Sequence, residues 1–301
     1  TSSISSAGMS GEALKIKKKA EQGDSTAQVK LGEMYSRGRN VLKNYKEAVK
    51  WYRMAAEQGI AEGQIRLGSS YSSGWGVAKD YKEAVKWYRM AAEQGSARGQ
   101  ATLSMMYEHG WGVPKDREKA MKLERMAAEQ GDTTAQYSLG WHYKYDIDPE
   151  DSKESMKWFR MAAEQGDANA QKRLGEFYED GNGVPQNYEE ALKWYRMAAD
   201  QGDALTQTKL GGMYEYGNGV PEDYVLAYMW YSLGEMNGDR YASDGLGTVA
   251  GSITASQISQ AEKMTRQWII QHDNIDEHSS LGVIYRELGR HEEAIAVFKK
   301  A

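Results

Sequence analysis

A five-residue string returns at almost constant spacing along this chain of 301 residues. Ala-Ala-Glu-Gln-Gly occurs at 55–59, 91–95, 127–131 and 162–166, and Ala-Ala-Asp-Gln-Gly occurs at 198–202. The intervals between them are 36, 36, 35 and 36 residues. A period of this length is typical of stacked supersecondary units and not of one globular core. The chain is therefore predicted to be a repeat array.

The order of segments along the chain follows from this period. A half-repeat stands before six full repeats, and the period breaks after Gly238. The predicted segments are a disordered lead-in at 1–10, a repeat array at 11–238 made of a half-repeat cap at 11–23 and repeats at 24–59, 60–95, 96–131, 132–166, 167–202 and 203–238, a helical capping segment at 239–273, and a helical hairpin at 274–301. About seventeen helices are expected from this arrangement.

Each repeat is predicted to be a pair of antiparallel helices, A and B. Helix A has the pattern Leu-Gly-x-x-Tyr, as at Leu31 and Tyr35, which places both large side chains on one face. Helix B has small and aromatic residues at helical spacing, as at Ala48 and Tyr52, which predicts a buried stripe. Gly32 lowers the helix propensity of helix A, so we expect it to allow a close approach of the neighbouring helix.

Polar residues mark the start of every helix B. An Asn or Asp stands four residues before the helix B alanine, and this residue type is a preferred N-cap. In four repeats a Glu follows three residues later, which predicts a reciprocal capping box. The N-cap candidates are Asn44, Asp80, Asp116, Asp151, Asn187 and Asp223, and the glutamates are Glu47, Glu83, Glu154 and Glu190. The Gly that closes each repeat is predicted to end helix B in the left-handed conformation.

Two further residue types recur in or near helix B. Methionines precede the Ala-Ala pair and are interpreted as core filler. They are Met54, Met90, Met126, Met161 and Met197. The tryptophans Trp51, Trp87, Trp158, Trp194 and Trp230 share one helix B position and are assigned to the core. Trp75 and Trp111 are expected to pack within the loops between helices A and B; the alternative is that they form a second exposed patch on one edge.

The full repeat reads Leu-Gly-x-x-Tyr, then Gly-x-Gly-Val, then Asp-Tyr-x-x-Ala-x-x-Trp-Tyr-x-x-Ala-Ala-x-Gln-Gly. This pattern resembles the Sel1-like repeat, a relative of the tetratricopeptide repeat. The resemblance implies an all-α fold, a right-handed α-solenoid of antiparallel helix pairs, and a role as a scaffold or adaptor, often in bacteria. The shorter spacing from Tyr285 to Ala294 resembles a tetratricopeptide hairpin. One bacterial branch has a cysteine pair in each repeat; this chain has no Cys, so the activities of that branch are not transferred.

Composition excludes several classes of function. The net charge is −5 at pH 7 with acids and bases nearly balanced, so no nucleic-acid partner is expected. No run of about 18 apolar residues is present, so no transmembrane segment is predicted. The five His residues lack metal-ligand spacing, and we predict neither a metal nor a cofactor. No nucleophile motif is present, so the chain is predicted not to be an enzyme.

The two ends of the chain bear on location and assembly. The lead-in at 1–10 is compatible with an expression-tag remnant or with the start of a mature chain whose signal peptide has been removed. A periplasmic or secreted location is favoured over a cytoplasmic one. A solenoid end needs a polar cap, so the natural chain is expected to continue past Ala301, or the hairpin packs on a partner. The expected state is a monomer, or a weak dimer through that hairpin.

By analogy with tetratricopeptide arrays, helix A is expected to line a concave groove. In the fourth repeat three aromatic residues are spaced by four, so they lie along one helix face apart from the core Leu139. Aromatic anchors in a groove are typical of binding hot spots. The predicted partner-binding residues are Tyr137, Trp141, Tyr145, Lys144, Met105, His109, Glu108, Lys172 and Glu176. The alternative is that the aromatics fill a tighter gap made by the shorter loop of this repeat.

A repeat fold does not name its ligand, so three functions remain open at this point. The first is a scaffold or adaptor that binds a protein or peptide partner in the groove. The second is a bacterial immunity or regulatory protein that binds and inhibits one specific enzyme. The third is an enzyme that acts on cell-wall or antibiotic substrates, which no residue pattern in the sequence supports.

Overall fold

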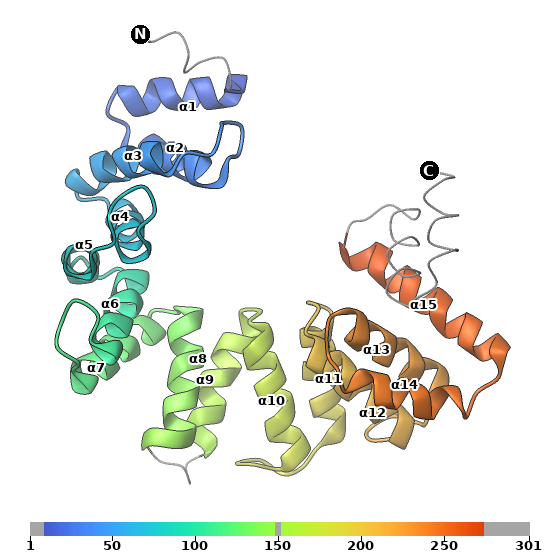
Figure 1. The fold of residues 1–301 in the computed structure, drawn as a ribbon. Coiled ribbons are helices and arrows are strands. Elements are labelled where there is room, and N and C mark those ends of the chain that lie inside the picture. Colours follow the sequence, from blue (N-terminus) through green and yellow to red (C-terminus); the bar gives the residue numbers. More distant parts are fainter. Residues whose placement is uncertain (1–8, 148–151, 274–301) are drawn as a thin grey trace. The chain divides into compact units, whose positions relative to one another are not determined.

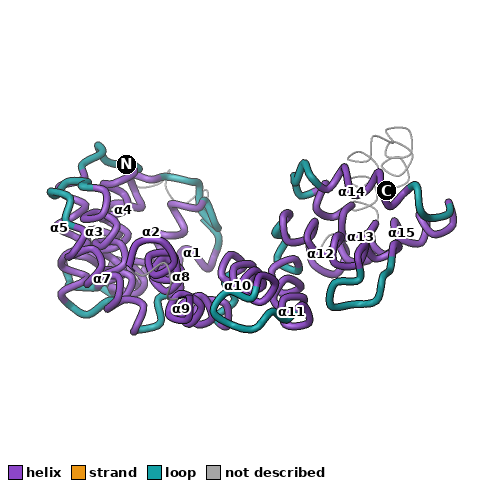
Figure 2. The backbone as a smooth tube through the Cα atoms, turned by 90° about the horizontal axis from the view of Figure 1, so that it is seen from below, coloured by secondary structure: helices purple, strands orange, loops and turns teal. Residues whose placement is uncertain are grey.

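The chain is helical throughout the part that the computed structural model describes, residues 9–147 and 152–273. Fifteen α-helices and one π-helical segment, η1, follow one another in that part, and it contains no strand (Figure 2). The predicted all-α solenoid is confirmed. Most of the predicted lead-in (1–8), the loop residues 148–151 and the C-terminal hairpin (274–301) lie outside the described residues.

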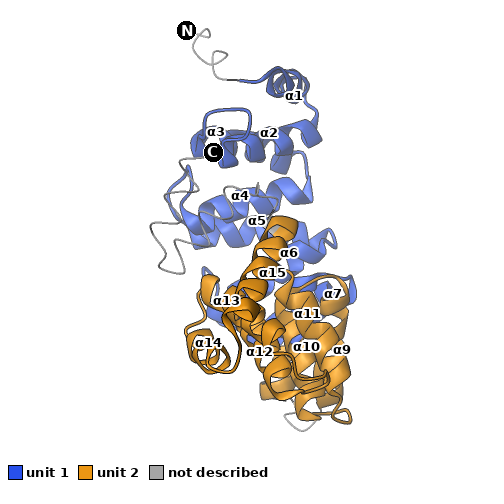
Figure 3. Cartoon of the chain, turned by 90° about the vertical axis from the view of Figure 1, so that its right-hand side faces the viewer, with its two compact units in different colours: residues 1–139 blue, residues 140–301 orange. Residues whose placement is uncertain are grey.

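The chain divides into two compact units between Leu139 and Gly140 (Figure 3). Unit 1 contains α1 (Gly11–Glu21), α2 (Ser25–Arg37), α3 (Tyr45–Glu57), α4 (Ala61–Ser73), α5 (Tyr81–Glu93), α6 (Ala97–His109), α7 (Arg117–Glu129) and most of α8 (Thr133–His142). Unit 2 contains η1 (Tyr143–Ile147), α9 (Ser152–Glu164), α10 (Ala168–Asp180), α11 (Tyr188–Ala199), α12 (Ala204–Tyr216), α13 (Tyr224–Met236), α14 (Ala242–Ala250) and α15 (Ala255–Asp273). Each described repeat is an A/B pair, such as α4 and α5 (Figure 1).

The predicted N-caps of helix B form, but the capping box is not completed. Oδ1 of Asn44 accepts a hydrogen bond from the backbone N–H of Glu47 (3.2 Å). The N–H of Asn44 itself donates to the carbonyl oxygen of Tyr35 (2.9 Å), so the Glu47 carboxylate is left to pair with Lys50. The Asp151 candidate lies outside the described residues. The same type of side-chain cap occurs at Asp80, Asp116, Asn187 and Asp223.

Glycine in helix A allows the close packing that its position predicts. A Cβ placed on Gly32 would lie 2.5 Å from Cε1 of Tyr52 in the paired helix B, and one on Gly68 would lie 2.7 Å from Cε1 of Tyr88. No side chain fits at such distances, so the aromatic ring occupies the space above the glycine. The same clash recurs at Gly140, Gly175 and Gly211.

The third repeat differs at both positions of this contact. Ser104 stands in place of the glycine, and Glu124 stands in place of the aromatic residue. Oγ of Ser104 donates to the carbonyl oxygen of Ala120 in helix B (2.8 Å), and both Ser104 and Glu124 are buried. The glycine is therefore needed only where an aromatic ring faces it.

A ladder of buried amides joins each helix A to the helices on either side. Gln64 is fully buried, and its Nε2 donates to the carbonyl oxygen of Ala56 at the end of the preceding helix B (3.3 Å). Its Oε1 accepts from Nε2 of Gln94, which follows helix B of the same repeat (2.8 Å). The equivalent amide pairs are Gln28 with Gln58, Gln100 with Gln130, Gln171 with Gln201, and Gln207 with Asn237. The recurring string made the Gln of Gln-Gly visible in the sequence, but its contact with the helix A amide was not predicted.

Four of the five helix B methionines expose 40% or more of their surface, so their interpretation as core filler was wrong. Each position precedes the buried Ala-Ala pair and lies on the opposite side of the helix from the buried stripe, because successive residues are rotated by about 100°. Met161 is half-buried. The exposed surface fractions are 42% for Met54, 43% for Met90, 40% for Met126 and 45% for Met197.

The tryptophans are less uniform than predicted. Trp158 and Trp230 are buried, whereas Trp51, Trp87 and Trp194 of the same helix B position are half-buried at the edge of the stripe. The loop tryptophans do pack, because Trp75 stacks on Tyr45 (5.6 Å between centroids) and Trp111 stacks on Tyr81 (5.5 Å). Both keep an exposed outer face.

Candidate functional site

In unit 1, two A helices of consecutive repeats contact each other more extensively than the B helices that follow them. In unit 1, α4 and α6 contact each other more extensively than α5 and α7 do (Figure 1). In unit 2, α12 contacts α14, which follows in the helix A position after α13, but α13 and α15 contact each other more extensively. The A helices α4 and α6 therefore lie on the more closely packed side of unit 1, where the sequence predicts a groove, and the helix A side is called the inner side below.

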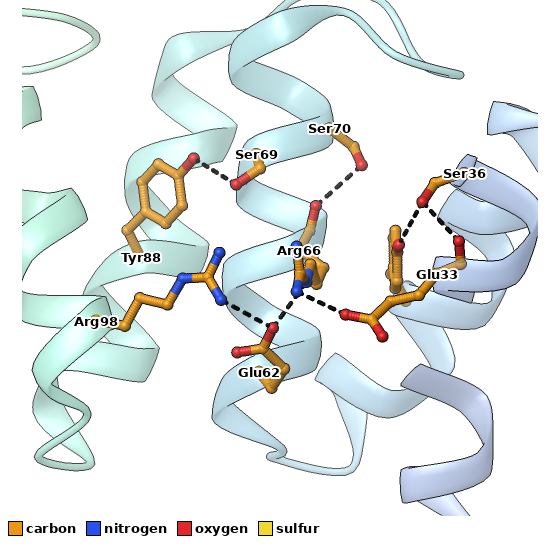
Figure 4. A network of polar contacts seen from close by, with 9 residues as sticks. Glu33, Ser36, Glu62, Arg66, Ser69, Ser70, Tyr88 and Arg98 are labelled. Carbon is orange, nitrogen blue, oxygen red and sulfur yellow. Dashed lines mark hydrogen bonds and ion pairs between the residues drawn. The ribbon is translucent and has the colours of Figure 1, made fainter. Parts of the chain in front are cut away.

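An ion-pair network runs along this inner side in unit 1 (Figure 4). The guanidinium of Arg66 on α4 contacts Glu33 on α2 (2.6 Å) and Glu62 on its own helix (2.7 Å). Arg98 on α6 reaches the same Glu62 carboxylate (3.3 Å). Charged side chains from three consecutive A helices are thus linked, and their charges are largely compensated.

Hydroxyl groups of buried helix B tyrosines point to the same side. The hydroxyl of Tyr88 donates to Oγ of Ser69 on the inner side of unit 1 (3.2 Å, Figure 4). In unit 2 the acceptor is a carboxylate, because Tyr231 donates to Glu215 (2.6 Å). Burial and this carboxylate raise the pKa of Tyr231 above its ordinary value, so the phenol remains a donor at neutral pH.

The predicted binding residues of unit 1 lie on α6 and α8. Met105 is exposed and lines a small cavity of about 210 Å³. The His109 ring lies against the loop residue Trp111, with 4.5 Å between ring centroids. The Glu108 carboxylate is paired with a lysine of the following loop, and Tyr137 is half-buried.

Aromatic and cationic side chains cluster at the start of unit 2. The rings of Trp141 and Tyr145 are stacked, with centroids 5.0 Å apart and an interplanar angle of 18°. The guanidinium carbon of Arg173 on α10 lies 4.5 Å from the Trp141 centroid, and Nζ of Lys144 lies 5.3 Å from the Tyr145 centroid. Trp141 also meets the buried Phe159 edge-on at 6.2 Å. Trp141 is therefore held by its neighbours, whereas Tyr145 exposes 56% of its surface.

A local change of helix type accompanies this cluster. The α-helix α8 ends at His142, and Tyr143–Ile147 continue as the π-helical segment η1. Segments of this kind are rare and occur often at functional sites, because the wider turn redirects side chains. Lys144 and Tyr145 are both part of that turn.

Two predicted groove residues are engaged within the repeats. Nζ of Lys172 lies 2.8 Å from Oδ2 of Asp203, which is the N-cap of α12, and the Lys172 side chain is only 12% exposed. Glu176 accepts from Arg173 at 2.6 Å. Lys172 therefore supports the next helix, and Glu176 orients the arginine that covers Trp141.

Residues 9–147 and 152–273 contain neither a metal-binding group nor a membrane-spanning helix. No group of three or more His, Asp or Glu side chains in those ranges is placed to hold a metal ion. Of the helices that the structure describes, none has both the length and the apolar character that crossing a bilayer requires.

The repeat pattern matches a known family model over most of the chain. The Sel1 repeat model matches residues 25–60, 61–96, 97–132, 133–167, 168–203 and 204–239. The chain belongs to the Sel1 repeat family. A tetratricopeptide repeat model matches 278–301, where the sequence predicts the hairpin. The comparison with curated proteins found no match.

Solved Sel1 structures share this architecture. The c5321 protein of uropathogenic Escherichia coli, described as a protective antigen with an SLR fold, is 37% identical with a TM-score of 0.76; the match covers 86% of this chain and 56% of that one. This chain therefore spans little more than half of that protein. A Sel1 repeat protein of Oxalobacter formigenes is 32% identical with a TM-score of 0.67, covering 74% and 98% of the two chains. The immunity protein Pa5087 of Pseudomonas aeruginosa is 22% identical with a TM-score of 0.46, and the match covers 76% of this chain and 83% of that one.

In a Sel1 array the recurring residues maintain the fold, so residues that differ among the repeats are the candidates for contact with a ligand. Sequence reasoning found the aromatic residues of the fourth repeat in this way but missed a basic group in the first two repeats. Arg37 is the last residue of α2, Arg39 lies in the first inter-helix loop, and Arg66 lies on the next helix A. A signal was present, because Arg39 stands where the next two repeats have Trp75 and Trp111.

Proposed function

We propose that this Sel1 repeat protein is a non-enzymatic scaffold that binds a protein or peptide partner along the inner, helix A side of its repeats. In unit 2 the proposed contact is the cluster of Trp141, Lys144, Tyr145 and Arg173. In unit 1 the proposed contacts are the exposed parts of Tyr137, Met105, Glu108 and His109.

The observation that carries this proposal is that Tyr145 is both exposed and held in a fixed orientation. Its ring is exposed, yet it stacks on a tryptophan that Arg173 and Phe159 hold in place. An exposed aromatic ring that is already oriented loses little side-chain entropy on binding, and such rings dominate interface energies. The nearby Lys144 ammonium adds a charge that can meet a partner carboxylate or aromatic ring.

The test uses short peptides selected from a random display library against the wild-type protein, with affinities measured by fluorescence polarisation. Replacing an interface hot spot by alanine costs about 2 kcal/mol, or about 30-fold in affinity. We expect Tyr145→Ala to weaken the selected peptides by about that factor, because the ring is the exposed anchor.

The matched control is Tyr241→Ala. Tyr241 exposes 57% of its surface, lies in the same unit and stacks with a single arginine, Arg240. We expect the peptides to bind this variant as they bind the wild type. Equal affinity for the wild type and Tyr145→Ala would refute the proposed role of the cluster.

A further inference from the structure

A polar cavity of about 460 Å³ lies in unit 1 between the first two repeats. Its walls come from three successive helices and the loop that joins the first two. Arg37 lies at the end of α2, Arg39 and Lys43 lie in the loop, Tyr52 lies on α3, and Arg66 lies on α4. Residues far apart in the repeat pattern therefore meet in one concave surface.

The charge of this cavity is one-sided. Arg37, Arg39, Lys43 and Arg66 line it, and no carboxylate does. Arg66 already has Glu33 and Glu62 as partners, outside the lining. Arg37, Arg39 and Lys43 are exposed and form no ion pair with another described residue. A concave surface lined by charges of one sign focuses the potential, so it favours an anionic group.

Neutral donors and an aromatic wall complete the cavity. The hydroxyls of Ser36 and Tyr52 are joined by a hydrogen bond (3.2 Å), and Ser69 also lines the wall. Trp75 also lines the cavity and is stacked on Tyr45. Guanidinium and hydroxyl donors together match the oxygens of a carboxylate or a phosphoryl group.

The same place in the sixth repeat has the opposite charge. A cavity of about 410 Å³ lies there between α12, α13 and α14, and Glu215, Asp239 and Asp244 line it together with one lysine. Glu215 occupies the repeat position of Ser36. The fold therefore accepts either charge at this place, and packing does not require the basic lining of the first repeat.

We propose that the cavity of Arg37, Arg39, Lys43 and Arg66 binds an anionic side chain of an acidic peptide segment in the partner protein. This inference rests on the proposed scaffold function and adds a second contact to it, on unit 1. The anionic group is a carboxylate or a phosphoryl group, and the aromatic wall of Trp75 contacts the adjoining part of the peptide.

The test compares three synthetic peptides of one length and sequence that differ at a central cluster: Glu, Gln or phosphoserine. Fluorescence polarisation measures their binding to the wild type and to Arg37→Gln/Arg39→Gln. We expect the Glu or phosphoserine peptide to bind about tenfold more tightly than the Gln peptide, and the double variant to abolish that difference. The tighter of the two anionic peptides identifies the source of the negative charge. Raising the salt concentration should weaken binding, because exposed charges are screened.

The matched control is Lys18→Gln/Lys19→Gln, which removes two exposed positive charges from α1 in the same unit. The proposal is overturned if the Gln peptide binds as tightly as the anionic peptides, or if the control variant loses as much affinity as Arg37→Gln/Arg39→Gln. Tyr145→Ala should leave binding of these peptides unchanged. Failure of this test therefore leaves the Tyr145 prediction standing, and the two proposals can fail separately.

Discussion

At the scale of single residues, the helix A glycine and the helix B aromatic ring share one space. Gly68 lies under the ring of Tyr88, whereas in the third repeat Ser104 is free to bond to helix B because Glu124 replaces the ring. The close approach at the glycine could be predicted from sequence. A glycine inside a helix lowers the stability of the helix, so its recurrence indicates that close packing compensates for the loss. The pairing of serine with glutamate could not, because it depends on what faces the position across the helix pair.

This pairing predicts that alanine destabilises the fold more at position 68 than at the equivalent position 104. Gly68→Ala should lower the free energy of unfolding by about 1–3 kcal/mol, because its Cβ would overlap the buried Tyr88 ring. Ser104→Ala should lower it by no more than about 1 kcal/mol, because the variant loses one hydrogen bond and creates no steric overlap. Urea unfolding followed by circular dichroism measures both. A Gly68→Ala protein as stable as the wild type would contradict the steric account.

At the scale of helices, the starts were predictable and some of their contacts were not. Asn44 caps helix B as its spacing predicts, because the cap is a local interaction. The predicted hydrogen bond from the backbone N–H of Asn44 to the Glu47 carboxylate is missing, because that N–H donates to the carbonyl oxygen of Tyr35 in helix A. The exposure of Met54 and the π-helical turn at Tyr145 were missed as well. The first follows from helix rotation, whereas no pattern in the sequence marks the second.

The N-cap of α12 predicts a dependence of stability on pH. Burial alone would raise the pKa of Asp203, but hydrogen bonds from Lys172 and Thr206 outweigh it and hold the pKa below its ordinary value. A carboxyl with a lowered folded-state pKa stabilises the fold above its unfolded-state pKa, about 3.9, and this contribution is lost as the pH falls through the folded-state pKa.

Asp203→Asn keeps a good N-cap residue but removes the partner of Lys172. We expect the variant to be less stable than the wild type by about 2 kcal/mol at pH 7, and the difference to shrink below about pH 4. Asp24→Asn is the control, because Asp24 caps α2 in the same way and has no lysine partner among the described ion pairs. Urea unfolding at a series of pH values measures both, and a difference that is constant down to acidic pH would disprove the role of the ion pair.

At the scale of the whole molecule, the repeat array, its helix pairs and its family could be predicted from one recurring string. The choice of the helix A side as the side for a partner was an analogy with tetratricopeptide arrays and stays a proposal. The structure shows two exposed apolar features on different helices of the pairs: the aromatic cluster at Tyr145, which continues a helix A, and the methionines, including Met197, which lie on B helices. The replacement of a loop tryptophan by Arg39 was a sequence signal for the basic cavity, but the contribution of Arg66 from the next repeat was not predictable.

The central claim is that a partner binds the helix A side, and site-specific photocrosslinking tests it most directly. A photoreactive amino acid is placed at Tyr145 in one protein and at Met197 in another, and each is irradiated with the peptides selected against the wild type. Both positions are exposed and lie in unit 2, so they differ chiefly in the side of the repeat on which they lie. We predict strong peptide labelling from position 145 and little from position 197. Labelling that is equal at the two positions, or stronger from position 197, would contradict the claim.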